Sequence, residues 1–189
     1  MNRMSERGQI LLTAEQLSRK EEALKNIIPQ KPVSGVLVNA MLIGLQLAIQ
    51  RTLGQGATAM TQLLVRNAEE FIRVLKAMGL LQNLSGNPLE DIPRVFRELE
   101  ISERVEVEEH SEPPGYTVRV WDSVFMPASV YLGMNNVPFT INPEALLAAG
   151  IIAQAVKEKY GGKARMRVNV TLPKRPGEPL VINVRVIVR

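Results

Sequence analysis

The sequence has no cysteine and a single histidine among its 189 residues. Without cysteine, the chain can form no disulfide, no thiolate metal site and no thiol nucleophile. The one histidine, His110, stands in the segment His-Ser-Glu-Pro-Pro-Gly, where we expect an exposed turn residue rather than a general base. A Ser-His-Asp triad and a histidine-based metal site are therefore not expected. We predict no catalytic residue, no metal and no cofactor, and we favour a role that is not enzymatic.

Long hydrophobic runs are also absent. The longest extends from Val36 to Ile49 and is interrupted by Asn39 and Gln46, whereas a membrane-spanning helix needs roughly 18 apolar residues or more. The first residues carry charges but lack the apolar core of a secretory signal peptide. We therefore expect a cytoplasmic protein with no membrane span.

The overall composition is typical of a globular domain. Hydrophobic residues make up 46% of the sequence and charged residues 22%, and these values argue against extensive disorder. The net charge of +4 combines an acidic segment at residues 100–122 with a basic segment at residues 157–189. Because two such segments can face each other across a sheet or a subunit contact, the basic pI does not by itself indicate nucleic-acid binding. Many Val, Ile and Arg residues without cysteine fit a thermophile.

The first half of the sequence predicts helices. Thr13 and Gln16 form a capping-box pattern that opens a polar helix, so we assign residues 1–32 to an N-terminal helical extension. Residues 33–189 are assigned to a single α+β domain of a ligand-binding type. From Val33 to Leu53 the residues are apolar on nearly every side of a helix, which predicts burial in the middle of the molecule or in a subunit interface.

Two further helices are expected before the first strand. Apolar residues at helical spacing indicate a long helix from about Ala57 to Met78, with Gly79 as its stop. A turn follows, and Pro88 or Pro93 begins a short helix that ends near Leu99.

The second half predicts two hairpins with a helix between them. Residues 104–121 and residues 163–188 each contain two segments of alternating apolar and polar residues around a turn. Asn142 as N-cap, Pro143 at the first helical position and Gly161 after the last turn define the helix between them. The predicted fold is α+β, with N-terminal helices packed on a twisted antiparallel sheet of about four strands and the order ββαββ in the C-terminal half. The expected inner face consists of Val105, Val107, Val118, Val120, Met166, Val168, Val170, Ile182, Val184 and Val186.

An unusually apolar segment, from Val120 to Phe139, connects the first hairpin to this helix. It contains Pro, Gly and Asn residues that favour an irregular chain, yet five of the eight aromatic residues of the protein lie between Tyr116 and Phe139. Such a crossover either packs on the core as a lid or lines an apolar ligand pocket between the helices and the sheet. The candidate ligand-binding residues are Met41, Leu45, Trp121, Phe125, Met126, Tyr131, Met134 and Phe139.

The order of these elements and several short motifs resemble the 4-vinyl reductase domain. Asp122, Ser123 and Phe125 are similar to the (E/D)-S-x-(F/A) stretch of that family, and residues 149–153 are similar to its central helix. The resemblance covers residues 55–189. It implies a fold shared with heme nitric-oxide-binding domains and with subunits of the transport protein particle.

This resemblance also implies a range of functions. Members of the family take part in tetrapyrrole biosynthesis or sense small hydrophobic ligands, and the relatives in vesicle transport dimerise through an apolar helix. Many members carry Cys or His where this chain has Phe139, Thr140 and Ile141, and this chain has no cysteine. A metal or heme role and reductase activity are therefore not carried over.

Three functions remain open at this point. The first is binding or sensing of a small hydrophobic ligand in an apolar pocket between helices and sheet. The second is a structural or assembly role as a homodimer through residues 33–53, with a vestigial pocket. The third is nucleic-acid binding by the basic last hairpin, which carries Arg165, Arg167 and Arg185. No aromatic residue follows Tyr160, so bases would have nothing to stack on and this third function is disfavoured.

Overall fold

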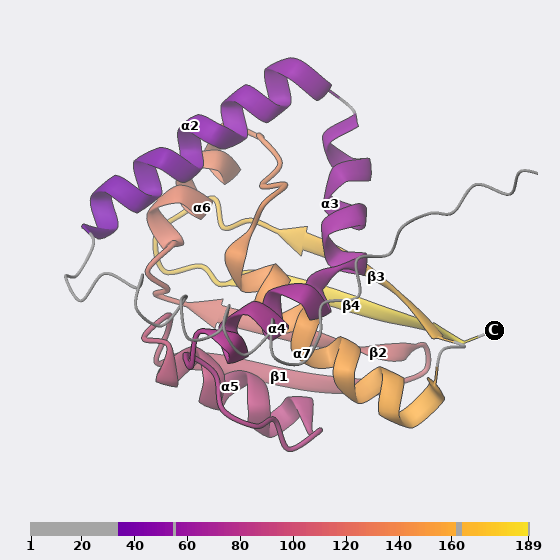
Figure 1. The fold of residues 1–189 in the computed structure, drawn as a ribbon. Helices are drawn as coiled ribbons and strands as arrows, with labels where there is room; N and C mark the ends of the chain where they lie inside the picture. The colour runs from indigo at the N-terminus through magenta and orange to yellow at the C-terminus, as the bar shows by residue number, and fades with distance from the viewer. Residues whose placement is uncertain (1–33, 55, 162–163, 189) are drawn as a thin grey trace, which may run out of the picture.

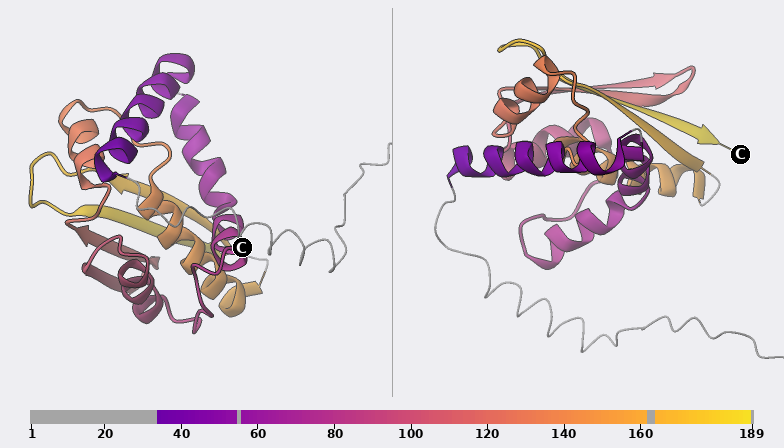
Figure 2. Two further views of the ribbon diagram at one scale, coloured as in Figure 1. Left: turned by 60° about the vertical axis from the view of Figure 1, so that its left-hand side comes forward. Right: turned by 90° about the horizontal axis from the view of Figure 1, so that it is seen from above.

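The computed structural model describes residues 34–54, 56–161 and 164–188. Within these ranges the chain forms six helices and a four-stranded antiparallel sheet (Figure 1). The helices gather on one side of the twisted sheet, as the view from above shows (Figure 2). The predicted α+β class is confirmed, with a second, short helix added between the two hairpins. The helix expected to open at Thr13 and the boundary expected at residue 32 lie outside the described residues.

Alternating side chains give the sheet one apolar face. Its strands have the order β1-β2-β4-β3, and every neighbouring pair is antiparallel. In register, Val118 of β2 lies opposite Ile182 of β4, which lies opposite Val170 of β3. The predicted inner face is therefore confirmed, and its members belong to the main core or pack against it. The strands are β1 (Arg104–Ser111), β2 (Pro114–Trp121), β3 (Ala164–Thr171) and β4 (Leu180–Val188).

Helix α7, Pro143–Tyr160, lies at the centre of the main hydrophobic core. The Asn142 side chain accepts a hydrogen bond from the backbone N–H of Ala145 at 2.7 Å, and Gly161 follows the last turn with a φ of 63°. The predicted cap, first-turn proline and terminal glycine are confirmed. Eleven of the 18 residues of α7 are buried, because the helix packs against the sheet on one side and against other helices on another.

Two helices, α3 (Gly56–Arg66) and α4 (Ala68–Ala77), occupy the range in which one helix was expected. They are separated at Asn67, whose side-chain amide donates to the carbonyl of Leu63 at 2.8 Å. Its backbone N–H bonds to the carbonyl three residues back instead of four. Asparagine side chains compete with the backbone for helical hydrogen bonds. The prediction of a single helix from Ala57 to Met78 is therefore wrong at this position.

The close crossing of α4 and α7 depends on a glycine. A Cβ atom on Gly150 would lie 2.5 Å from Cγ1 of Ile72 and 2.7 Å from the carbonyl oxygen of Ala68. Both distances are far inside van der Waals contact. Gly150 therefore allows the backbone of α7 to approach α4 more closely than any other residue would.

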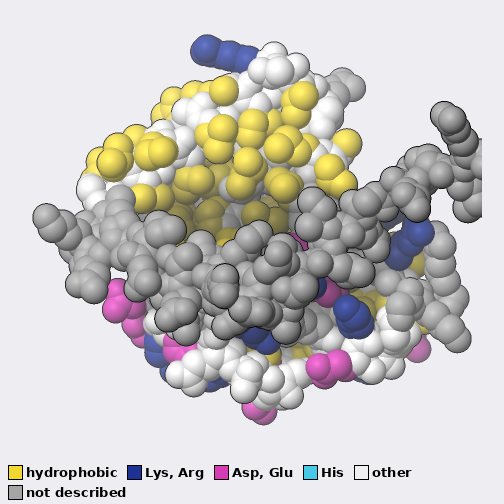
Figure 3. All heavy atoms as spheres, in the orientation of Figure 1, with side chains coloured by type: hydrophobic (Ala, Val, Ile, Leu, Met, Phe, Trp, Pro, Cys, Tyr) yellow, Lys and Arg dark blue, Asp and Glu magenta, His cyan; other side chains and the backbone are white. Residues whose placement is uncertain are grey.

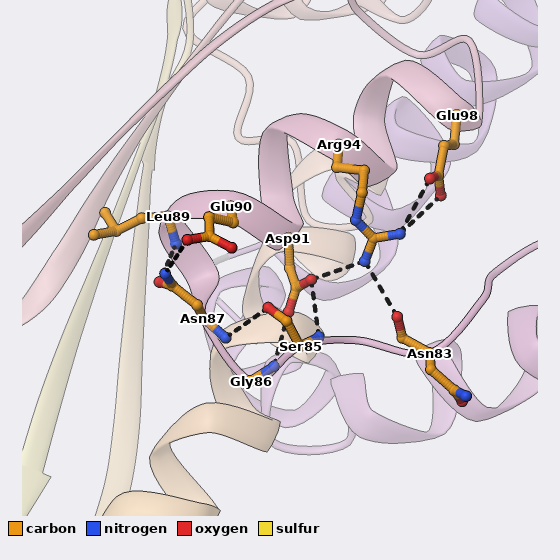
Figure 4. Close-up of polar contacts among 9 residues, drawn as sticks. All are labelled: Asn83, Ser85, Gly86, Asn87, Leu89, Glu90, Asp91, Arg94 and Glu98. Atoms are coloured by element: carbon orange, nitrogen blue, oxygen red, sulfur yellow. Dashed lines mark hydrogen bonds and ion pairs between the residues drawn. The ribbon is translucent and has the colours of Figure 1, made fainter.

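Helix α5, Pro88–Glu98, is held at its beginning by Asp91, which is 1% exposed. The Asp91 carboxylate accepts hydrogen bonds from the backbone N–H groups of Ser85 and Gly86 at 3.0 and 3.1 Å, and from Arg94 at 2.8 Å (Figure 4). Burial by itself raises the pKa of Asp91, but the hydrogen bonds from Arg94 and from the two N–H groups outweigh it and hold the pKa below its ordinary value. The carboxylate thus ties the turn before α5 to the helix.

A short helix, α6 (Met126–Met134), forms within the apolar crossover after β2. The expectation of an irregular segment is therefore wrong. Pro127 lies in the first turn, where its missing N–H is not needed. Ala128 and Leu132 pack with Phe139 in a small second core. The Pro, Gly and Asn residues of this segment mark the ends and the close contacts of a helix, not the absence of one.

Helix α2, Gly35–Leu53, confirms the expected helix but not its expected burial in the middle of the molecule. Only two of its 19 residues are buried, Asn39 and Gln46. The helix lies at one edge of the domain (Figure 1). Asn39 and Gln46 face the domain together with Leu42 and Ile43, whereas Leu37, Met41 and Leu45 are exposed. The alternative expectation, a subunit interface, stays a prediction. By length and composition alone, α2 could cross a membrane, so the absence of a membrane span also stays a prediction.

Candidate functional site

The eight candidate ligand-binding residues lie in three separate places. Met41 and Leu45 are on α2, with 66% and 49% of their surface exposed. Trp121 ends β2, where the Arg104 guanidinium stacks 4.2 Å from the centre of its ring. The other five belong to α6 and its flanks: Phe125, Met126, Tyr131, Met134 and Phe139.

Helix α6 directs its candidate residues to different sides. Tyr131 and Met134 are exposed, whereas Met126 and Phe139 are buried. One hollow of about 420 Å³ lies between α3, β3 and the chain after α6, and a second of about 600 Å³ lies between α3, α4, α7 and β3. Of the eight candidates, only Phe139 lines either hollow. The structure therefore does not gather these residues around one of the two hollows.

A different arrangement involves the polar side chains of α2, which face the domain. Asn39 Nδ2 donates to the backbone carbonyl of Val124 at 2.8 Å, and Asn39 Oδ1 accepts from the backbone N–H of Ala128 at 2.9 Å. The amide also donates to Gly35 within its own helix at 2.8 Å. Asn39 thus fixes the first half of α2 to the beginning of α6.

Gln46 makes the equivalent attachment two helical turns later. Its Nε2 donates to Thr140 Oγ1 at 3.0 Å, and its Oε1 accepts from the backbone N–H of Thr140 at 2.7 Å. Gln46 is 1% exposed and Thr140 is 2% exposed. A spacing of seven places Asn39 and Gln46 on one face of the helix, so both polar side chains face inward together.

The opposite side of α2, which we call the outer face, is apolar and exposed. It consists of three large side chains and three small residues: Leu37, Ala40, Met41, Gly44, Leu45 and Ala48. Leu37 is 54% exposed, and no charged residue occurs between Gly35 and Gln50. Figure 3 shows apolar side chains gathered over α2 and over the neighbouring α3. Such a contiguous patch is unusual on the surface of a monomeric soluble protein.

The outer face cannot turn inward without a large loss of hydrogen bonds. Rotating α2 would separate Asn39 and Gln46 from four partner groups on the domain. Each buried polar group left without a partner costs about 1–3 kcal/mol. The inward bonds therefore determine the outward orientation of the apolar residues.

Exposed apolar side chains also occur on the helices that contact α2. Leu63 of α3 is 59% exposed, and Tyr131 and Met134 of α6 are 46% and 64% exposed. Both α3 and α6 pack against α2. These side chains extend the apolar character of this end of the domain beyond the outer face itself.

A buried carboxyl group, that of Glu144, lies next to Ser123 in the chain that leads into α6. Glu144 is fully buried at the beginning of α7, and its Oε1 accepts a hydrogen bond from Ser123 Oγ at 2.6 Å. Its Oε2 has no hydrogen-bond partner among the described residues. Burial raises the pKa of Glu144, although the hydrogen bonds from Ser123 and from its own backbone N–H lower it. The Glu144 carboxyl group is therefore enclosed by protein and does not face the solvent.

The sequence identified Asn39 and Gln46 only as interruptions of an apolar run. Their spacing of seven, in a helix with no charged residue from Gly35 to Gln50, was the available signal. It indicates a helix that attaches by its polar side and leaves its apolar side for another contact.

The described ranges contain no group of three or more acidic or histidine side chains that could hold a metal ion. No family model matches the sequence, and no solved structure matches it. The resemblance to the 4-vinyl reductase domain therefore stays a prediction. The chain is 30% identical over 158 residues to uncharacterized protein MJ0312 of Methanocaldococcus jannaschii, which covers 79% of this chain and 76% of the relative.

Proposed function

The chain belongs to the same family as this uncharacterized protein of Methanocaldococcus jannaschii, and we propose that it is a structural assembly subunit that forms a homodimer through the outer face of α2. The observation that carries the proposal is the inverted polarity of α2. Asn39 and Gln46 are hydrogen-bonded to the domain, whereas the large apolar side chains of the outer face, Leu37, Met41 and Leu45, are exposed.

The free energy of the exposed face favours a partner. Apolar surface in water costs about 25 cal/mol per Å² relative to its buried state. The outer face contains no charge, so a partner can cover it without the desolvation penalty of a buried ion.

A second copy of this chain fits the face by symmetry. In a twofold dimer the same patch contacts itself, and the outer face can meet its own copy with only apolar groups in contact. Gly44 lies near the middle of the face, and a Cβ atom there would meet nothing within 4 Å. Two α2 helices could therefore cross closely at this point.

Other occupants fit less well. A membrane span would require Asn39 and Gln46 to leave their partners on the domain and enter lipid with their amides unpaired. Within the sequence before α2, residues 13–26 fit the face poorly, since they contain six charged residues. The large apolar residues in that range are Leu17 and Leu24.

Light scattering on a dilution series tests the proposal, using the wild type and two variants. Leu45→Glu places a charge on the outer face, and Leu89→Glu places the same charge on α5, at a leucine of similar exposure, 40% against 49%. We expect a dimer for the wild type and for Leu89→Glu, and a folded monomer for Leu45→Glu.

Two results would overturn the proposal. One is a wild-type monomer at every concentration, and the other is a Leu45→Glu variant that remains a dimer. A wild-type monomer that sediments with anionic or neutral vesicles would assign the face to lipid. A monomer that dimerises only when residues 1–28 are removed would assign it to the segment before α2.

A further inference from the structure

The larger hollow, of about 600 Å³, is separate from the outer face of α2. It lies between helices α3, α4 and α7 on one side and strand β3 on the other. Its floor is apolar and consists of Val65 from α3, Ala153 and Val156 from α7, and Met166 from β3. The volume is in the range of small-molecule sites.

The rim of this hollow is basic. Arg66, Arg165 and Arg167 line it, and among the described residues none of the three makes an ion pair. Lys157 also lines it and pairs with Glu69 at 3.2 Å. The hollow is therefore lined by four basic groups and by one carboxylate, that of Glu69, which already pairs with Lys157.

The sheet register places a further arginine on β4, the neighbour of the edge strand β3. Arg167 lies directly opposite Arg185 on β4, and like charges at opposed positions of a sheet are destabilising. Arg165 and Arg167 are on the same face of β3 because they are two residues apart, and Met166 between them is on the opposite, inner face. Since β3 is the edge strand of the sheet, residues of both faces line the hollow at this edge. An anion bound at this edge would relieve this repulsion.

We infer that the hollow binds an amphipathic anion, with an apolar body against Val65, Val156 and Met166 and a carboxylate or phosphate head at the arginines. Guanidinium groups bind either head through paired hydrogen bonds. None of the described residues that line the hollow is aromatic, so it offers no stacking surface for the bases of a nucleic acid. This inference does not depend on the dimer.

Calorimetric titration tests it with dodecanoate and dodecyl phosphate, each below its critical micelle concentration. Dodecanol and inorganic phosphate each supply one half of the proposed ligand. Titrations in the Leu45→Glu background separate this hollow from the outer face of α2. We expect dodecanoate and dodecyl phosphate each to bind more tightly than dodecanol or inorganic phosphate. Which of the two amphiphiles binds more tightly will show whether the hollow favours a carboxylate head, as in a fatty acid, or a phosphate head.

The matched variants are Arg165→Glu and Arg175→Glu. Both residues are exposed, but only Arg165 lines the hollow, whereas Arg175 lies in the turn between β3 and β4. Arg165→Glu should weaken binding by about tenfold or more, and Arg175→Glu by less than about threefold. Ala164→Phe, which fills the hollow from its rim, should weaken binding with every charge retained.

Several outcomes would overturn the inference. If dodecanol bound as tightly as the two amphiphiles, the arginines would play no part in binding. If inorganic phosphate bound as tightly as dodecyl phosphate, the apolar floor would play none. Equal losses in Arg165→Glu and Arg175→Glu would indicate a diffuse charge effect. Tight binding of a single-stranded oligonucleotide with no binding of either amphiphile would assign the basic edge to nucleic acid.

Discussion

Gln46 and Thr140 exchange two hydrogen bonds across 94 positions of the sequence, one from the Gln46 amide to the Thr140 hydroxyl and one from the Thr140 backbone N–H to the Gln46 carbonyl oxygen. Both residues are buried. This pair joins α2 to the chain just before α7, and with Asn39 it determines which side of α2 meets the solvent.

Replacing Gln46 with Leu should detach this end of α2. The change leaves the N–H and hydroxyl groups of Thr140 without partners, and we expect a loss of about 2 kcal/mol in the free energy of unfolding. Hydrogen exchange of the α2 amides should accelerate more than that of α7. Urea denaturation and exchange measured by mass spectrometry would check both effects.

Gln50 provides the matched control. It lies one turn further along α2, and its side-chain oxygen is buried without a hydrogen-bond partner among the described residues. Gln50→Leu should therefore be neutral or slightly stabilising. Equal losses for the two variants would mean that the bonds of Gln46 do not hold the helix.

The Asp91 carboxylate should make stability depend on acidic pH. Its pKa is lower in the folded state than its ordinary value, so its contribution is present above the unfolded-state pKa and is lost as the pH falls through the folded-state pKa. Asp91→Ala should cost about 3 kcal/mol at neutral pH, and the difference from the wild type should shrink below about pH 4. Urea denaturation across this range measures it. Glu90→Ala, on the exposed side of the same turn, should cost less than about 1 kcal/mol, and a constant difference for Asp91→Ala at all pH values would contradict the prediction.

Glu144 should have the opposite dependence. Its pKa is raised in the folded state, so its contribution is complete below the unfolded-state pKa and is lost as the pH rises through the folded-state pKa. Glu144→Gln keeps the shape without the titration, and its stability relative to the wild type should improve as the pH rises above about 4. Thermal unfolding at each pH would measure the trend. Glu103→Gln, with a side chain 84% exposed, is the control, and parallel curves for Glu144→Gln and the wild type would refute the prediction.

Two glycines in helices should respond to alanine with opposite signs. Gly150→Ala forces α4 and α7 apart, since its Cβ would overlap Ile72 and Ala68, and should cost about 2 kcal/mol. Gly44→Ala meets open space and should stabilise the monomer by about 0.5–1 kcal/mol, because glycine is a poor helix former. Denaturation at a concentration where the chain is monomeric compares them. Similar effects of the two changes would disprove the close crossing at Gly150.

The elements with strong local signals could be predicted from the sequence. The alternation of Val118, Val120 and their partners specified both hairpins, and the cap, proline and glycine around α7 specified its two ends. These signals are local because turn chemistry and the spacing of apolar residues act within a few residues.

The remaining features depend on contacts between residues that are far apart in the sequence. The orientation of α2 depends on Thr140 and Val124, and no pattern within α2 alone identifies them as partners. Helix α6 was missed because Pro127 and Gly133 suggest a loop, whereas the first begins the helix and the second lies against Pro173. The hollow beside β3 forms only when α3, α7 and β3 come together, so its lining could not be read from any one segment.

The strand order has a consequence for the synthesis of the protein. Strand β4 is the last of the four to be translated, yet it lies between β2 and β3 and pairs with both. On the ribosome, the first hairpin and α7 emerge before β4, so the position between β2 and β3 is still unfilled. The apolar faces of the hairpin and of α7 stay partly exposed until β4 pairs there. Such partly completed sheets are prone to aggregation. Chaperone demand for this protein should therefore fall once β4 is inserted between β2 and β3.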